Sequence, residues 1–238
     1  MKKVLGVIAL LLAAAPAHAQ VMQWQDRGFA NVNVLAQPQS RNVTDTSTFT
    51  LYDEQGTVTG PRKIGGGPVF DLSGGYRVWH NLAIGLGYSH FSDSSNVTVT
   101  ARVPDPLVFD QPVQQDLNAG KLDHAEDAMH ISAVWFWPVT DKIDVAASAG
   151  PSIFFVSDQG VTGVTVQPNT SIATGVTTSK ETETGVGVNL GVDVTYLVTQ
   201  KIGAGVTMRY AGASVDLPTV DSLKVGGFQI GAGLRYRF

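Results

Sequence analysis

Seven charged residues at alternate positions of strand-like segments are the first candidates for chemistry in this sequence. Three are acids and four are arginines: Asp71, Asp144, Asp193, Arg77, Arg209, Arg235 and Arg237. Opposite charges facing one enclosed space could select or gate ions. They could also form a salt-bridged plug, because an unpaired buried charge is costly. The plug is favoured where strands enclose a space that is just wide enough to be filled by side chains.

Two smaller groups also have residue types that could act chemically. His90 and Ser92 are two positions apart, so in a strand they share a face, as a general base and a nucleophile would need to. No acid that would orient His90 can be identified, and we expect no enzymatic activity. His124, Glu126 and His130 share a face as well. A strand rise of about 3.3 Å per residue keeps all three from one metal ion. We expect them to lie at the surface or rim, with no metal and no cofactor.

Composition excludes several classes of protein. Charged residues make up 15% of the 238 residues, against about 25% in average domains. After the N-terminus there is no run of 18 apolar residues, which excludes a helical membrane protein. The 26 glycines and 11 prolines disfavour a helix bundle. The absence of cysteine excludes disulfides and thiol chemistry, and a net charge of −4 gives no basic surface for nucleic acid.

The N-terminus has the pattern of a secretory signal peptide. Lys2 and Lys3 precede an apolar stretch from Val4 to Ala17, and Ala17-His18-Ala19 is a cleavage site of the A-x-A kind. We therefore expect residues 1–19 to be a signal peptide for Sec export and residues 20–238 to form one domain.

The elements that must position the charged residues show a period of two. In the C-terminal segment, apolar residues at every second position lie opposite glycine, glutamine and arginine, which is the pattern of a strand with two unlike faces. Eight segments alternate in this way: 30–36, 70–78, 82–88, 129–137, 143–149, 186–196, 202–210 and 227–238. The fifth is expected to continue toward Phe155.

The connections between these strands alternate in length. Short ones lie near 79–81, 140–142 and 198–201, and long ones run about 37–62, 92–123, 157–184 and 214–224. Parts of the long ones keep the alternation, as at Val97, Val99 and Ala101. This layout predicts an all-β fold, an eight-stranded antiparallel up-and-down transmembrane β-barrel, with both termini on the short-turn side.

The alternative is a soluble sandwich or lipocalin-like barrel, in which the apolar face points inward. The seven charges all fall on the polar face, and a Lys or Arg facing lipid at the midplane costs about 2–4 kcal/mol. Aromatic residues also gather at both ends of the strands, as in the two interfacial belts of a membrane barrel. We therefore expect the apolar face to meet lipid.

The end of the chain resembles the C-terminal targeting strand of bacterial outer-membrane β-barrel proteins. The outward residues that carry this resemblance are Phe228, Ile230, Leu234, Tyr236 and Phe238. The whole chain after residue 19 is similar to a small barrel of the OmpA/OmpX type, without a periplasmic peptidoglycan-binding domain. The resemblance implies that the barrel-assembly machinery recognises the last strand, that periplasmic chaperones escort the chain, and that outer-membrane lipid and lipopolysaccharide surround the barrel.

These observations predict a non-enzymatic outer-membrane protein of a Gram-negative bacterium. Its loops would serve envelope integrity, adhesion or surface contact, with a host or another cell surface as partner. One alternative is a small pore or a port for hydrophobic compounds. Another is a lipid A-modifying enzyme, because some outer-membrane barrels that deacylate lipid A use a His-x-Ser pair like His90 and Ser92.

Overall fold

The computed structural model describes residues 26–217 and 220–238, and within them the chain forms ten antiparallel strands. The strands are β1 (Gly28–Gln37), β2 (Arg41–Leu51), β3 (Glu54–Ile64), β4 (Gly67–Trp79), β5 (Leu82–Val103), β6 (Val113–Pro138), β7 (Ile143–Val166), β8 (Ala173–Leu197), β9 (Ile202–Leu217) and β10 (Val220–Arg237). No helix in these ranges is long and apolar enough to cross a membrane. The expected signal peptide, residues 1–19, lies outside the described residues.

Eight of the strands close into a ring, in the order β1, β4, β5, β6, β7, β8, β9 and β10. The last strand, β10, pairs with the first, β1. The closure is completed beyond β10, where Gly28 N donates to Phe238 O at 2.7 Å and Phe238 N donates to Gly28 O at 3.0 Å. These eight strands contain the eight predicted segments except Phe238, which follows β10, and the three predicted short connections join them at one end. The predicted eight-stranded up-and-down barrel is therefore confirmed.

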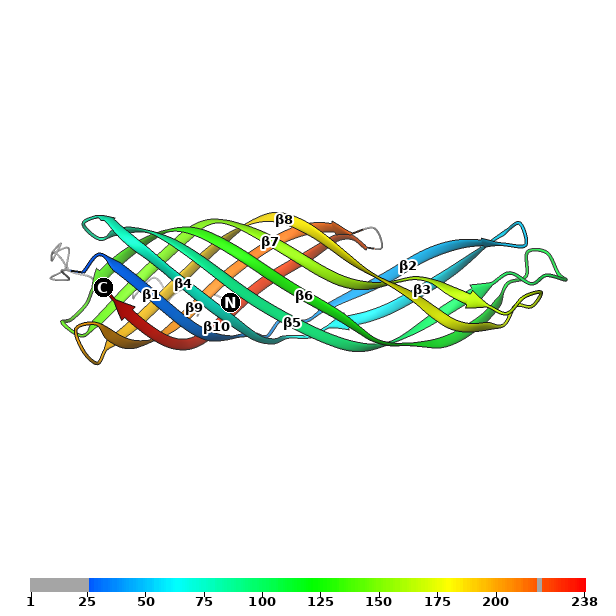
Figure 1. The fold of residues 1–238 in the computed structure, drawn as a ribbon, viewed down its shortest axis with the longest axis horizontal. Coiled ribbons are helices and arrows are strands. Elements are labelled where there is room, and N and C mark those ends of the chain that lie inside the picture. The colour runs from blue at the N-terminus through cyan, green and yellow to red at the C-terminus, as the bar shows by residue number, and fades with distance from the viewer. Residues whose placement is uncertain (1–25, 218–219) are drawn as a thin grey trace, which may run out of the picture.

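At the other end, most of the sequence that was predicted to form long loops is strand, so this prediction is wrong. The four strands β5 to β8 have 22 to 26 residues each, at least twice the roughly 9–11 that cross a bilayer. The segment 37–62 contains β2 and most of β3, a hairpin that joins the sheet where Thr57–Thr59 pairs with Thr100–Arg102. Figure 1 shows β2, β3 and the far ends of β5 to β8 extending well beyond the ring.

The physical reason lies in the outward face of these extensions. Inward positions keep small apolar residues such as Val97 and Val99, which are buried. Outward positions carry Thr, Ser and Asn, outside the apolar belt. The difference in hydrophobicity between the two faces is therefore smaller than in the ring. The segments still form strands, because Thr and Val are good strand formers. Buried and exposed residues still alternate there, as expected for Val97, Val99 and Ala101.

The ring carries a continuous apolar belt on its outer face. Exposed large apolar side chains occur on all eight strands of the ring. Aromatic ones mark both edges of the belt, with Trp79, Trp137 and Phe238 at the short-turn end and Phe70, Phe155 and Tyr210 toward the other end. The predicted orientation, apolar outside and charged inside, is the one that the structure has.

The interior is divided into layers that can be followed along one strand. The inward residues of β6 run from Phe136 and Val134 through Ser132 and His130 to Ala128, then to Glu126 and His124, and finally to Leu122. Apolar and polar groups thus alternate along the axis. The layers do not follow the register, because the strands of a barrel are tilted: Ala128 lies beside Ser89, and Leu122 lies beside Ser95.

Candidate functional site

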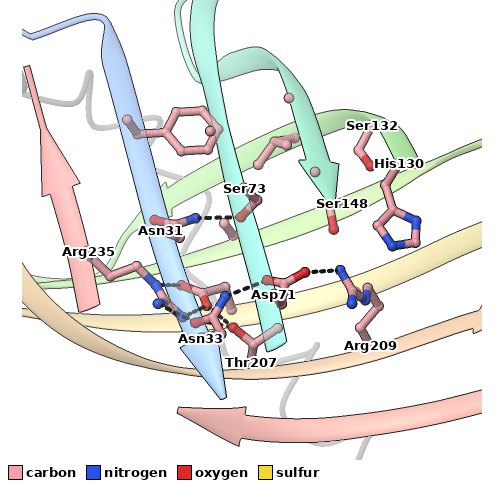
Figure 2. A pocket seen from close by; sticks show the side chains of 18 of the residues that line it. Asn31, Asn33, Asp71, Ser73, His130, Ser132, Ser148, Thr207, Arg209 and Arg235 are labelled. Carbon is pink, nitrogen blue, oxygen red and sulfur yellow. Dashed lines mark hydrogen bonds and ion pairs between the residues drawn. The ribbon is translucent and has the colours of Figure 1, made fainter. Parts of the chain in front are cut away.

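The polar layer of the ring holds a charge network that crosses the interior. Arg209 on β9 donates from Nη1 to Asp71 Oδ2 on β4 at 2.6 Å, and both side chains are buried. The same guanidinium donates from Nε and Nη2 to Gln229 Oε1 at 2.9 and 2.6 Å. Figure 2 shows Asp71 and Arg209 reaching toward each other from opposite strands. Three hydrogen bonds to two partners hold this arginine in place.

A second ion pair in this layer is tied to the first by one asparagine. Arg235 donates from Nε to Asp193 Oδ1 at 3.1 Å, and Thr207 Oγ1 donates to Asp193 Oδ2 at 2.5 Å. Asn33 accepts from Arg235 Nη1 at 2.6 Å and donates to Asp71 at 2.7 Å. The two pairs therefore form one connected network, visible in Figure 2 as dashed lines from Arg235 through Asn33 to Asp71 and Arg209.

The remaining charges that the sequence singled out lie nearer the short-turn end. Arg237 is ion-paired with Asp144, and both are buried. Arg77 is half-buried on β4, and its backbone N donates to Arg27 O at 2.8 Å. Each of the three candidate acids thus meets a different candidate arginine: Asp71 with Arg209, Asp193 with Arg235, and Asp144 with Arg237.

A small cavity of about 100 Å³ lies inside this polar layer. It is lined by members of the network and by His130, whose ring lies between Ser89 Oγ at 3.0 Å and Ser152 Oγ at 2.7 Å. On the side of the cavity toward the short turns lies an apolar layer, in which the rings of Phe29 and Phe136 pack edge to face at 5.4 Å. A cavity of this size has room for a few water molecules.

A wider apolar layer lies on the other side of the polar layer. It contains Leu35, Val69, Phe91, Phe154 and Val156, all buried, together with residues of β9 and β10. These side chains come from seven of the eight strands of the ring, all except β8, and from β2 and β3. An ion placed among these side chains without a polar partner would be costly to bury.

A second charge cluster, which the sequence did not reveal, lies against the far side of the apolar layer, where Glu126 is the register partner of Phe91 and Val156. Arg62 bonds to Asp158 and lies 3.2 Å from Asp45, while Arg41 lies 2.6 Å from Glu126. His124 joins the two halves, with Nδ1 2.7 Å from Asp158 Oδ1 and Nε2 2.9 Å from Glu126 Oε1. The arginines were missed because residues 37–62 were expected to be a loop. The available signal was the alternation of Arg41, Val43 and Asp45 in β2.

The expectation that His124, Glu126 and His130 form a surface or rim cluster is wrong, because all three are buried inside the sheet. His130 belongs to the polar layer and the other two to the second cluster, since the inward face of β6 passes through both. Among the described residues, no group of three His, Cys, Asp or Glu side chains is arranged to hold a metal ion.

The second cluster balances its charges when His124 is protonated. Both ring nitrogens face carboxylates, and only the imidazolium can donate to two acceptors. Although burial opposes the charged form, the hydrogen bonds to Asp158 and Glu126 raise the pKa of His124. The partner bonds likewise hold the pKa of Glu126 and of Asp158 below their usual values. Two arginines and one imidazolium then face three acids, of which Asp45 has its pKa raised by burial.

On the outer face, His90 does have an acidic partner, contrary to the sequence analysis. Asp127 of β6 is its register partner, and its Oδ1 lies 2.7 Å from His90 Nδ1. The hydroxyl of Tyr88 donates to the same oxygen at 2.6 Å. Ser92 is exposed on the same face of β5, but none of the hydrogen bonds found among the described residues joins it to His90. The sequence could not reveal Asp127, because it is 37 positions away.

The far end of the extended sheet forms a cross-linked tip. The hydroxyl of Tyr52 donates to Thr170 O at 3.0 Å, and Asp110 N donates to Glu54 Oε2 at 3.1 Å. These bonds tie the turn of β2–β3 to the turns after β7 and β5. Leu107 and Phe109 protrude from this tip and are 90% and 77% exposed.

Comparison with known proteins points to one family. A family model described as an outer membrane protein beta-barrel domain matches residues 5–238. None of the curated proteins matches the chain.

Solved structures with a similar fold include Neisserial surface protein A, with 15% identity, a TM-score of 0.47, and coverage of 89% of this chain and 97% of that one. The outer membrane protease OmpT of Escherichia coli has 10% identity, a TM-score of 0.45 and coverage of 90% and 97%. The outer membrane protein OprG of Pseudomonas aeruginosa has 11% identity, a TM-score of 0.43 and coverage of 90% and 96%.

Proposed function

Because the chain belongs to the family of outer membrane protein beta-barrel domains, we propose that it is an outer-membrane anchor for a rigid external contact surface. In this proposal the apolar belt of the ring lies in the bilayer, and β2, β3 and the far halves of β5 to β8 stand outside the cell. The tip then makes the contacts that serve adhesion or the integrity of the envelope. The single observation that carries this function is the length of sheet beyond the belt, ending in the exposed Leu107 and Phe109.

The closed interior supports an anchor more than a pore. Two charge clusters are separated by the apolar layer around Phe91 and Phe154, and each cluster pairs its own charges. An ion crossing the barrel would have to leave water at this layer, which is very costly for a charge. The charged residues Asp71, Asp144, Asp193, Arg77, Arg209, Arg235 and Arg237 then serve as a structural plug.

The tip is suited to contact with a partner, because its hydrogen-bonded turns keep apolar side chains exposed. Isolated exposed apolar residues are common on surfaces, but here Leu107, Val108 and Phe109 are adjacent and all exposed. Leu107 N donates to Asp105 Oδ1 at 2.8 Å, which fixes the start of this turn. Little conformational entropy would be lost when such a preformed turn meets a partner on a host or another cell.

The proposal also covers biogenesis. Residues 1–19 would direct Sec export from the cytoplasm of a Gram-negative cell, and periplasmic chaperones would carry the chain to the barrel-assembly machinery. The machinery would recognise the outward residues of β10, Phe228, Ile230, Leu234, Tyr236 and Phe238, which are exposed on the finished barrel. Outer-membrane lipid and lipopolysaccharide would then surround the belt.

Adhesion of whole cells tests the proposed contact surface. Cells that display the protein with Leu107→Ser and Phe109→Ser should bind to epithelial cells and to one another less than cells with the original protein. The matched control is Val139→Ser, because Val139 is also apolar and exposed but lies in a short turn at the opposite end. Unchanged adhesion by the tip variant, with equal amounts of protein at the surface, would refute a contact role for the tip.

The hydrogen bond between His90 and Asp127 favours a second candidate function, hydrolysis of an acyl ester of lipid A. An acid that orients a histidine is the third member of the nucleophile–base–acid arrangement, and Ser92 would be the nucleophile. The lack of a hydrogen bond between Ser92 and His90 places this candidate second. The acyl pattern of lipid A in cells that carry His90→Ala or Ser92→Ala tests it, and an unaltered pattern would exclude it.

A further inference from the structure

A band of polar and aromatic side chains crosses the outer face of the barrel at the edge of the apolar belt that is farther from the short turns. The register places Phe70 beside His90, His90 beside Asp127, and Asp127 beside Phe155. All four point outward: Phe70 and Phe155 are 48% and 40% exposed, and the side chains of His90 and Asp127 are 45% and 39% exposed. A hydrogen-bonded acid–imidazole pair therefore lies between two exposed aromatic rings.

The carboxylate of Asp127 keeps acceptor capacity on its outer side. Both hydrogen bonds from the protein, those of Tyr88 and His90, reach Oδ1. Among the described residues, none of the hydrogen bonds found reaches Oδ2. A carboxylate oxygen can accept two hydrogen bonds, so Oδ2 is available for donors from a ligand. A charged group facing lipid is costly unless it is solvated or paired, and a ligand with hydroxyl groups would satisfy it.

An open apolar groove of about 860 Å³ leads away from this band along the outer wall. It begins at Tyr88 and Met129 and reaches Phe238 near the short-turn end. Ala30 and Gly74 are register partners in its middle, so the groove passes over two positions without large side chains. Its walls include Leu72, Tyr76 and Leu86. The lining is apolar and elongated, which suits a hydrocarbon chain.

We propose that this band and groove form a binding site for one glycolipid of the outer leaflet. The sugar head would lie on the band, with its hydroxyl groups donating to Asp127 Oδ2 and its apolar faces against Phe70 and Phe155. One acyl chain would lie in the groove below Tyr88. The head group would be recognised by its hydroxyls and not by phosphate, because the band and the groove lining contain no lysine or arginine. The inference rests on the membrane setting of the proposed function but not on its tip.

Native mass spectrometry of the purified barrel in a short-chain detergent tests this site, with tetradecyl maltoside as the probe. One molecule should bind saturably. Asp127→Asn removes the charge and Ala30→Leu fills the groove, and each should weaken binding about tenfold, the effect of one lost charge-assisted hydrogen bond or a blocked chain. The control Ala204→Leu makes the same change at an outward position on β9, away from the groove, and should bind like the original protein.

A second probe distinguishes sugar from phosphate recognition. Tetradecylphosphocholine has the same chain with a phosphate head, and it should bind more weakly than the maltoside and respond to Ala30→Leu but not to Asp127→Asn. Equal binding of the maltoside by the original protein and both site variants would overturn the proposal, as would equal affinity for the two probes. Asp127→Asn keeps the side-chain volume and lies on the surface, so it remains informative if Ala30→Leu folds poorly. Loss of adhesion with intact lipid binding, or the reverse, separates this inference from the proposed contact function.

Discussion

Arg209 donates a 2.6 Å hydrogen bond to Asp71 across the interior of the barrel, although 138 positions separate them in the chain. Their strands, β9 and β4, are not neighbours in the ring, since β1 and β10 lie between them. The pair therefore spans the lumen and ties two parts of the wall that share no backbone hydrogen bonds. Its contribution can be measured because each partner can be removed alone.

The variant Asp71→Ala should be strongly destabilised, because it leaves the buried charge of Arg209 without its acid. Removing one partner of a buried pair typically costs about 3–5 kcal/mol. The double variant Asp71→Ala with Arg209→Met should recover part of this loss, since the uncompensated charge is also removed. Urea unfolding of the refolded protein in micelles, followed by tryptophan fluorescence, gives both values. A double variant that is less stable than the single one would contradict this account.

The sequence predicted the inward direction of these charges but not their pairing. Alternation along a strand fixes the face on which Asp71 or Arg209 lies, because the period of a strand is two. Which charges meet across the lumen depends on how far each strand is shifted along its neighbours. That shift follows from the sum of all registers around the ring, which no local pattern contains.

The second cluster and the outer band were missed for different physical reasons. Arg41 and Arg62 lie in β2 and β3, where polar residues occupy outward positions and lower the contrast between the faces. Asp127 was not recognised as the partner of His90 because residues 92–123 separate the two in the sequence. The pairing of β5 with β6 brings them together. Both cases show that a period of two predicts which face of the sheet a residue lies on, but not which residues of other strands it contacts.

The apolar layer in the interior leads us to expect that the protein does not conduct ions. The apolar layer around Leu35, Phe91 and Phe154 crosses the barrel above the polar layer. Purified protein in a planar bilayer should therefore show no discrete openings at moderate voltage. Discrete openings that disappear in Arg209→Ala and Asp193→Ala variants would show instead that the polar layer lines a pore.

His124 should make stability depend on pH on the alkaline side. Its folded pKa is raised above the ordinary value of 6.5, so its contribution is complete below that value and is lost as the pH rises through the folded pKa. The lowered pKa values of Glu126 and Asp158 act oppositely, since their contribution is lost as the pH falls through their folded pKa values.

The measurement is the urea midpoint of unfolding as a function of pH. The original protein should resist urea less as the pH rises above neutrality, because the stabilisation from His124 is lost as the pH rises through its raised pKa. The variant His124→Gln can still form hydrogen bonds but cannot titrate, and its midpoint should change much less over this range. If the variant and the original protein lose stability in parallel, the dependence comes from other groups.

Deletion of Phe238 should slow insertion of the barrel into the membrane. The ring of Phe238 stacks on Tyr236, with centroids 5.8 Å apart. Its backbone makes the two hydrogen bonds with Gly28 that complete the closure between β10 and β1. Gly28 has no side chain, and a Cβ there would lie 2.4 Å from the ring of Phe238, so the ring lies directly over the first strand.

The deletion removes the ring and both bonds, whereas Phe238→Ala removes only the ring and should have a smaller effect. The time course of the compact, heat-modifiable form on gels, with Phe109→Ala at the opposite end as the control, measures both. Insertion of the truncated chain at the original rate and level would show that the last residue is not needed for recognition or closure.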